Sequence, residues 1–178
     1  AATLHSEHGF DVDNLDGKAR KPALLRCLHS PLVKQYVTVS QHLRQILIQD
    51  VGIAPDRISQ IYNGVDTDRF KPMWPRIRSE LPPSFQGDEL FIMGTVGRIR
   101  PVKDQGTLIK AFAEAVSGHS EGRRRMRLLL VGDGPSLPAH HALVAELGVE
   151  GLVWFAGARH DVPQLLQALD LFILPSLN

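Results

Sequence analysis

Apolar residues recur with two different spacings in the second half of the chain. Short runs that are apolar throughout alternate with stretches in which apolar residues return every three or four positions. The first pattern is typical of strands buried on both faces, and the second of amphipathic helices. In order they predict strand Leu90–Val96, helix Asp104–Val116, strand Arg127–Val131, helix Leu137–Leu147, strand Leu152–Ala156, helix Asp161–Leu169 and strand Leu171–Leu174. This alternation predicts an α/β fold, a Rossmann-like parallel sheet with helices on both faces.

The first half carries a shorter version of the same alternation. Apolar positions at helical spacing predict a helix from Ala19 to about Leu28, and Gln35–Val39 has the composition of a strand. Ser40 stands where the N-cap of a second helix belongs, and Gly52 closes that helix. Asp56–Tyr62 predicts a further short strand.

Proline and glycine separate the two halves. The turn signal Asn63-Gly64 is followed by a stretch that contains Pro72, Pro75, Pro82, Pro83 and Gly87. This composition is typical of a linker or surface excursion. We therefore expect a first region at 1–70, a linker or surface excursion at 71–88, and a second domain at 89–178.

Composition limits the classes of function. The chain has 178 residues, 43% of them hydrophobic, which is enough for a real core. A formal net charge of +1 argues against a general nucleic-acid binder, and no aromatics interleave with the basic run Arg123–Arg125, which we interpret as a solvated loop. The single cysteine excludes an intrachain disulfide and favours a reducing compartment. No apolar run approaches the roughly 20 residues that span a bilayer.

The stretch from Gly94 to Gly106 is the clearest candidate for chemistry. An apolar strand leads into glycine, then into three cations, Arg98, Arg100 and Lys103, and then into a helix. Glycine lets the backbone approach a ligand, and the start of a helix offers free N–H groups. This construction suits a phosphate or diphosphate. The alternative is a set of solvated loop cations after an ordinary strand.

Glycine or proline also marks the other predicted strand exits, Gly132–Pro135, Gly157–Asp161 and Pro175-Ser176. Ligands of open parallel sheets bind beyond the carboxyl ends of the strands, so these loops are expected near the same site. The dinucleotide fingerprint is absent because Gly132-x-Gly134 lacks a third glycine at the required spacing. The Walker A pattern and the Gly-x-Ser-x-Gly elbow are absent too, which disfavours simple nucleotidases and serine hydrolases.

Taken in order, these motifs resemble a known family. Gly97-Arg98-x-x-Pro101-x-Lys103, Leu130–Pro135, Phe155-x-Gly157 with Asp161-Val162, and Asp170–Ser176 resemble the retaining GT-B glycosyltransferases of the glycogen synthase and sucrose synthase type, the group 1 glycosyltransferases. Upstream, Val37–Ser40 and Tyr62–Asp66 with Phe70-x-Pro72 resemble the passage between that family's two domains. The stretch His5–Gly17 looks most like sugar transferases associated with exopolysaccharide and exosortase (PEP-CTERM) systems.

The resemblance implies a role for individual residues. It assigns the donor diphosphate to Gly97, Arg98 and Lys103, the nucleotide side to Gly132, Asp133 and Gly134, and the base to backbone atoms of Asp161 and Val162. His8 matches the family's His-Gly, whose imidazole faces the donor sugar, although a loop histidine with a local hydrogen bond fits equally well. Neither a metal nor a cofactor is expected, and Asp11-Val-Asp13 and Asp66-Thr-Asp68 are interpreted as turns or caps.

The resemblance also implies what the sequence holds. We expect an incomplete GT-B C-terminal domain with its strands ordered 3-2-1-4, plus a remnant of the N-terminal domain. Both ends are interpreted as cuts, because the sequence begins at Ala1 without an initiating Met and stops just where a predicted strand leads into a loop. The family's pair of donor-binding glutamates would follow the position at which this sequence ends. A fragment of this kind is expected to be inactive alone.

The implied function is sugar transfer, with retention, from a nucleotide-diphosphate sugar. The acceptor would be a sugar or a lipid-linked molecule, in exopolysaccharide or glycoconjugate synthesis. The expected location is the cytoplasm, at the inner face of the membrane, with peripheral membrane association of the longer protein and no nucleic acid as partner. The alternative is a non-catalytic Rossmann-like module that binds a nucleotide or phosphate.

Overall fold

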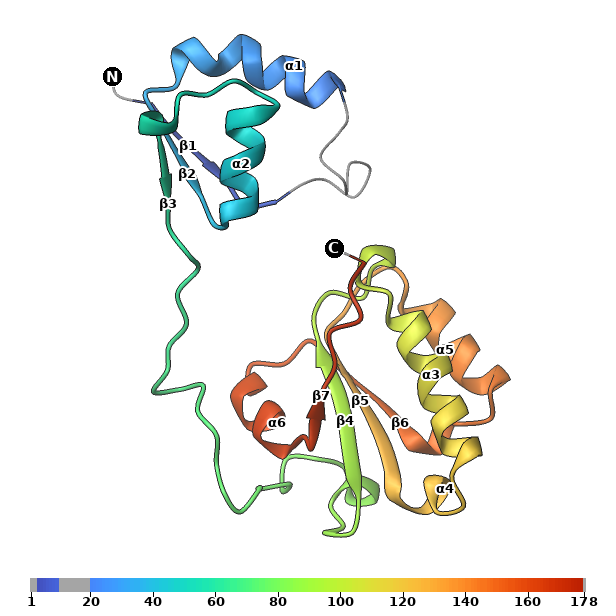
Figure 1. Cartoon of the computed structure of the whole chain (residues 1–178). Helices are drawn as coiled ribbons and strands as arrows, with labels where there is room; N and C mark the ends of the chain where they lie inside the picture. The colour runs from blue at the N-terminus through green and yellow to red at the C-terminus, as the bar shows by residue number, and fades with distance from the viewer. Residues whose placement is uncertain (1–2, 10–19, 178) are drawn as a thin grey trace. The chain divides into compact units, whose positions relative to one another are not determined.

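The computed structural model describes residues 3–9 and 20–177 (Figure 1). The chain divides into two compact units, Ala1–Val65 and Asp66–Asn178. Each unit has a parallel sheet of its own.

The first unit is a three-stranded sheet in the order β1-β2-β3. Its helices and strands are β1 (Leu4–Glu7), α1 (Arg20–His29), β2 (Gln35–Thr38), α2 (Gln41–Gln49) and β3 (Ile58–Gln60). The Ser40 hydroxyl accepts a hydrogen bond from the Leu43 N–H at 3.2 Å, which confirms the predicted N-cap of α2. Gly52 adopts a φ of 76° after this helix, a conformation that favours glycine.

Strand β1 has no apolar signal in the sequence. Of its four residues only Leu4 is apolar, so periodicity alone did not predict the strand. It is fixed by its neighbour, since Leu4 to Glu7 pair in parallel register with Gln35 to Thr38. Glu7 is buried and accepts two hydrogen bonds from the Arg26 guanidinium, at 3.1 and 2.9 Å.

The second unit is a four-stranded parallel sheet in the order β6-β5-β4-β7. Its helices and strands are β4 (Phe91–Val96), α3 (Gln105–Gly118), α4 (Gly122–Arg125), β5 (Met126–Val131), α5 (Leu137–Glu146), β6 (Val153–Gly157), α6 (Val162–Ala168) and β7 (Leu171–Phe172). The sheet confirms the expected α/β fold and its 3-2-1-4 strand order. One interpretation was wrong: Arg123–Arg125 belong to the short helix α4 rather than to a loop.

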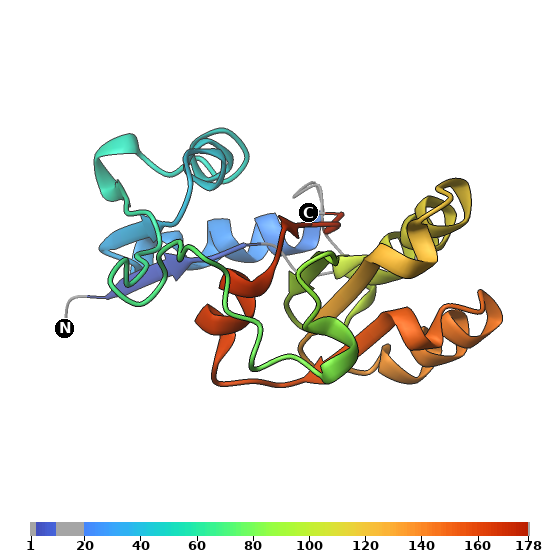
Figure 2. The ribbon, with the colours of Figure 1, turned by 90° about the horizontal axis from the view of Figure 1, so that it is seen from below.

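Helices cover both faces of this sheet (Figures 1 and 2). Leu128 and Leu130 of β5 pack in a buried cluster with residues of α3 and α5. Leu129 and Val131, which alternate with them, pack with Leu165 of α6 in a second cluster. The run Leu128–Val131, which is apolar at every position, therefore contributes to the buried clusters on both faces of the sheet.

The proline-rich stretch is part of the second unit and packs against its sheet and helices. Within residues 71–88, Leu81 and Phe85 are buried in the same cluster as α6. The Arg78 guanidinium donates to the backbone carbonyls of Gly87 and Leu90 and, at 2.6 Å, to the carboxylate of Asp170. The Ile92 N–H donates to the same carboxylate at 2.7 Å. Composition indicated irregular backbone here, but it could not indicate that buried side chains hold this backbone in place.

In the part of the chain that the structure describes, no helix combines the length and apolar character needed to cross a membrane.

Candidate functional site

Three strand exits of the second unit are joined by backbone hydrogen bonds. The Gly97 N–H donates to the Val131 carbonyl at 2.9 Å, and the Ile99 N–H donates to the Asp133 carbonyl at 2.9 Å. The Gly132 N–H donates to the Gly157 carbonyl at 2.8 Å. The loops after β4, β5 and β6 therefore lie side by side at the carboxyl edge of the sheet.

These loops surround an open hollow of about 370 Å³, called the exit hollow below. It is lined by Val96, Gly97, Arg98, Val131, Gly132, Asp133, Ala158, Arg159 and Val162. Five of the sequence-predicted site residues are thus brought together: Gly97, Arg98, Gly132, Asp133 and Val162. Lys103, Gly134 and Asp161 flank the hollow in the chain but do not line it.

Glycine is required where the first two loops meet. Gly132 has a φ of 135°, and a Cβ atom there would stand 1.9 Å from the Gly97 carbonyl oxygen. A Cβ atom at Gly134 would stand 2.2 Å from the Ile99 carbonyl oxygen. In both cases the added Cβ atom would overlap backbone atoms, which cannot move aside as a side chain can. The backbones of the two loops are therefore in direct contact in this part of the site.

Gly97 differs from these two glycines. A Cβ atom at Gly97 would meet no other atom within 4 Å, and its φ lies outside the left-handed region. The fold itself therefore does not require glycine at this position. A ligand that approaches the backbone of the exit hollow would require it.

The two predicted diphosphate-binding cations come from the loop between β4 and α3. Arg98 is exposed, and Lys103 is half-buried at the end of a 3-10 turn, Pro101–Lys103. Among the residues that the structure describes, neither cation has an ion pair. Both are therefore available to an anion. Arg100, which has no predicted role, is exposed.

A buried amide holds the Arg98 loop in place. Gln105, in the first turn of α3, is 2% exposed, and its Nε2 donates to the Arg98 carbonyl at 3.0 Å. Because the amide fixes the backbone and not the guanidinium, the Arg98 side chain keeps its freedom to reach a ligand.

The opposite wall of the exit hollow carries a pair of charged side chains. The Arg159 guanidinium donates to both oxygens of Asp161, at 2.8 and 2.6 Å. The hydrogen bond from Arg159 lowers the pKa of the Asp161 carboxyl. The guanidinium also stands 5.9 Å from the centre of the Trp154 ring. Asp161 therefore uses its side chain to fix Arg159 instead of capping α6.

Sequence reasoning missed Arg159. A cation two residues after the strand-exit glycine Gly157 and two residues before Asp161 was the available signal. That signal is weak, because single exposed arginines are common on protein surfaces. Only the structure shows that the guanidinium is locked by Asp161 and lines the hollow.

His8 belongs to the first unit. It follows β1, is exposed, and lies 2.8 Å from the Ser6 hydroxyl through its Nε2 atom. A local hydrogen bond of this kind was one of the two alternatives for His8, and its role towards a donor sugar stays a prediction.

The short acidic patterns have separate outcomes. Asp66 Oδ1 accepts hydrogen bonds from the N–H groups of Asp68 and Arg69, both at 3.1 Å, so the predicted turn role is confirmed there. Asp11 and Asp13 lie outside the described residues. Over residues 3–9 and 20–177, His, Cys, Asp and Glu side chains form no group of three or more that could hold a metal ion.

A parallel sheet in this strand order, with glycine-rich loops around a hollow at its carboxyl edge, defines the class of Rossmann-like ligand-binding units. Residues 91–178 match the family described as glycosyl transferases group 1, and residues 1–69 match the family described as glycosyltransferase family 4. The chain belongs to the group 1 glycosyltransferases and has the α/β architecture of the GT-B fold.

Relatives extend over most of this chain. A D-inositol 3-phosphate glycosyltransferase of Stackebrandtia nassauensis is 31% identical over 152 residues, which are 80% of this chain and 33% of the relative. An Escherichia coli UDP-Gal:alpha-D-GlcNAc-diphosphoundecaprenol alpha-1,3-galactosyltransferase is 26% identical over 181 residues, with 98% of this chain and 45% of the relative covered. The chain thus spans between a third and a half of these curated relatives.

A solved structure has a similar fold over most of this chain. Anabaena Alr3699/HepE in complex with UDP superimposes with a TM-score of 0.76 at 26% identity, covering 97% of this chain and 47% of that chain.

Proposed function

We propose that the chain is the nucleotide-binding part of a retaining glycosyltransferase that moves a hexosyl group from a nucleotide-diphosphate sugar to an acceptor. The observation that carries the proposal is the exit hollow. Its lining combines the backbone of Gly97 and Gly132 with Arg98, a cation that has no acidic partner in the described residues. Membership of the group 1 family and the UDP bound to the Anabaena relative support it.

In this proposal the two ends of the donor are treated differently. Arg98 and Lys103 bind the diphosphate and stabilise the negative charge that grows on it as the bond to the sugar breaks. Gly97 lets the backbone approach the donor. Gly132, Asp133 and Gly134 form the loop on the nucleotide side, which packs against the loop of Gly97 because its two glycines carry no Cβ atom. Asp161 and Val162 lie near the base, and Arg159 adds a flat cationic surface on that wall.

The acceptor is proposed from the relatives alone. The Escherichia coli relative is named for a diphosphoundecaprenol-linked acceptor. We therefore propose a lipid-linked sugar acceptor in exopolysaccharide or glycoconjugate synthesis on the cytoplasmic side. Because the chain spans half or less of these relatives, transfer is proposed for a longer protein, with His8 facing the donor sugar, and not for this chain by itself.

The test is a transfer assay with a longer protein that carries this chain, using the donors UDP-glucose, UDP-galactose and GDP-mannose. Replacing both Arg98 and Lys103 by alanine should lower kcat by at least about 10²-fold, the loss typical of removing groups that stabilise developing charge. Unchanged turnover would refute the proposed roles.

Arg100→Ala is the matched control, because this exposed cation stands in the same loop but has no proposed contact with the donor. It should leave kcat within about twofold. If nucleotide binds, depends on Arg98 and Lys103, and yet no sugar is transferred from any donor, the chain serves as the non-catalytic binding module instead.

A further inference from the structure

The pair Asn63-Gly64 combines two residue types that can react with one another. Of the three asparagines in the sequence, only Asn63 precedes a glycine. Glycine leaves its backbone nitrogen accessible to the preceding side chain, because no Cβ atom stands beside that nitrogen. The pair is a turn signal in the sequence, but residues 61–66 form neither a helix, a strand nor a turn. A tight turn therefore does not account for the pair.

No hydrogen bond holds the backbone of this pair in the part of the chain that the structure describes. The Ile61 N–H donates to the Thr38 carbonyl at 2.9 Å, so the chain is still attached to the first sheet at that point. Residues 62–65, which follow, neither donate nor accept a hydrogen bond within 3–9 and 20–177. The Gly64 nitrogen and the Asn63 amide are thus both without a partner there.

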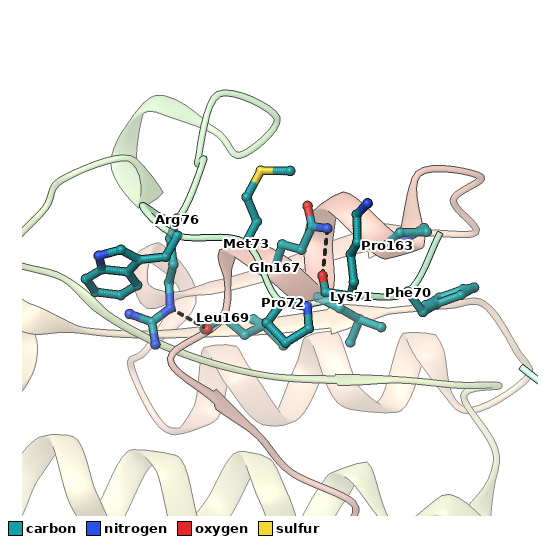
Figure 3. Close-up of a pocket in the computed structure, with 10 residues that line it drawn as sticks. Phe70, Lys71, Pro72, Met73, Arg76, Pro163, Gln167 and Leu169 are labelled. Carbon is teal, nitrogen blue, oxygen red and sulfur yellow. Dashed lines mark hydrogen bonds between the residues drawn. The ribbon is translucent and has the colours of Figure 1, made fainter. Parts of the chain in front are cut away.

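After this stretch the chain is attached to the second unit. The Arg69 guanidinium donates to the His160 carbonyl at 3.0 Å. The Gln167 amide of α6 donates to the Lys71 carbonyl at 3.0 Å, as Figure 3 shows. Residues 62–65 therefore lie between two anchored segments, and the lack of hydrogen bonds is confined to them.

The pair is also exposed to water. Asn63 and Gly64 are both exposed, and their neighbours Tyr62 and Val65 are 68% and 65% exposed. A Cβ atom added to Gly64 would meet no other atom within 4 Å. Among the described residues, no neighbour therefore restricts the backbone at Gly64 or keeps water away from it.

We propose that Asn63-Gly64 is a site of spontaneous deamidation in the folded protein. Asparagine is among the thermolabile residues. The Gly64 nitrogen, after losing its proton to water or hydroxide, attacks Cγ of Asn63. A C–N bond forms, the bond from Cγ to the amide nitrogen breaks, and that nitrogen takes a proton from the solvent and leaves as ammonia.

The product of this step is a five-membered succinimide ring. Water then opens the ring at either of its two carbonyls. Opening at the side-chain carbonyl gives aspartate, and opening at the backbone carbonyl gives isoaspartate. Water is the only co-reactant, and no electron is transferred.

The reaction changes the connection between the two compact units. A new carboxylate adds a negative charge near Asp66 and Asp68, in a stretch, residues 58–68, that contains no cation. Isoaspartate also carries the main chain through Cβ and Cγ, which lengthens the chain by one methylene group. Neither unit needs to rearrange, because residues 62–65 make no hydrogen bond in the described structure. The proposal does not rest on sugar transfer.

The test is incubation of the folded chain at pH 8, followed by tryptic digestion and mass spectrometry of residues 58–69. Trypsin cleaves after Arg57 and Arg69, so this peptide contains Asn63 and no other asparagine. We expect deamidation within about fivefold of the rate in a synthetic peptide of the same sequence, because a segment without hydrogen bonds has almost no opening cost. A slower reaction in the folded chain would overturn the proposal.

The products report the reaction path. Fragmentation that separates isoaspartate from aspartate should find both forms of the peptide. Aspartate without isoaspartate would indicate direct hydrolysis of the amide and would contradict the succinimide step.

Two variants serve as matched controls. Gly64→Ala keeps Asn63, and its methyl group has free space in the fold. It should slow deamidation by at least about tenfold, or about 1.4 kcal/mol in the barrier, because the Cβ atom hinders the approach of the nitrogen. Asn63→Gln should give no modified peptide over the same period, since its attack would have to form a six-membered ring. An unchanged rate in Gly64→Ala would contradict the proposed attack.

A third variant tests whether the pair is free of the fold. Asn63→Asp reproduces one product of the reaction and should unfold at the same urea concentration as the unchanged chain. A lower midpoint would show that Asn63 supports one of the units, which contradicts the unrestrained geometry on which the proposal depends.

Discussion

The two walls of the exit hollow are built by different means. On the side of β4 and β5, the backbones of two loops touch, and Gly132 and Gly134 leave no space for a Cβ atom. On the side of β6, two side chains, Arg159 and Asp161, fix one another through two hydrogen bonds. The first wall is formed by the backbone of the fold itself, and the second wall is formed by side chains that the fold carries.

This difference predicts how each wall responds to change. At the positions where the two loop backbones touch, a side chain cannot be added without moving the sheet edge, so stability and binding should fall together. A wall made of side chains can be removed while the fold stays intact, so binding alone should fall. The following substitutions test this separation, beginning with the largest expected effect.

Gly132→Ala should be the most damaging change. The new Cβ atom would overlap the Gly97 carbonyl oxygen, and a φ of 135° is unfavourable for alanine. We expect the free energy of unfolding to fall by more than about 3 kcal/mol, measured by urea denaturation. Gly151→Ala is the control, since a Cβ atom there meets nothing within 4 Å. Similar stability of the two variants would show that the loops are not interlocked.

Gly97→Ala should separate stability from binding on the same wall. A Cβ atom here has free space and φ is not left-handed, so the free energy of unfolding should stay nearly unchanged. If the donor diphosphate lies against this backbone, nucleotide affinity should fall roughly tenfold, or about 1.4 kcal/mol, by calorimetry. Full affinity would place the ligand elsewhere.

Arg159→Ala should affect binding alone and less strongly. Loss of a stacked guanidinium costs about 1 kcal/mol, roughly a fivefold loss of nucleotide affinity. The melting temperature should hardly change, because the ion pair with Asp161 is partly exposed and such pairs contribute little to stability. Asp161→Asn keeps the guanidinium and should weaken binding less than Arg159→Ala does. The reverse order would mean that Asp161 itself contacts the ligand.

The smallest expected effect is a pH dependence of stability caused by His140. This residue belongs to α5 and lies beside Gly106, in the first turn of α3. Burial lowers the pKa of this imidazole, and its Nε2 atom is buried without a hydrogen-bond partner in the described residues. The unfolded chain therefore binds a proton more readily, and stability should fall as pH drops through the ordinary histidine range near about 6.5. His140→Leu should flatten this slope in denaturation measured between pH 8 and pH 5.5. An unchanged slope would assign it to other groups.

The sequence was most informative where a backbone requirement forces a residue type. Gly132 follows an apolar strand at such a position, and the same pattern of strand and glycine precedes Arg98, so strand, turn and cation could be located without coordinates. The 3-2-1-4 strand order came from the family resemblance, because periodicity locates strands but does not order them.

Features that depend on partners distant in sequence were not predictable. Arg159 gains its meaning from Asp161 and the neighbouring loops, and β1 is a strand only because β2 pairs with it. Asp170 lies about ninety positions from Arg76 and Arg78, the two arginines with which it forms ion pairs. No local pattern marks such pairs, since each residue by itself has the composition of an ordinary surface.

Calorimetric titration with UDP and UMP tests most directly whether Arg98 and Lys103 bind a diphosphate. The two ligands share base and ribose and differ by one phosphate, so their difference in affinity reports the diphosphate contact alone. We expect the unchanged chain to bind UDP at least about tenfold more tightly than UMP, and the variant with both cations replaced by alanine to lose this preference. If the variant kept the same preference for UDP over UMP as the unchanged chain, the proposed site would be contradicted.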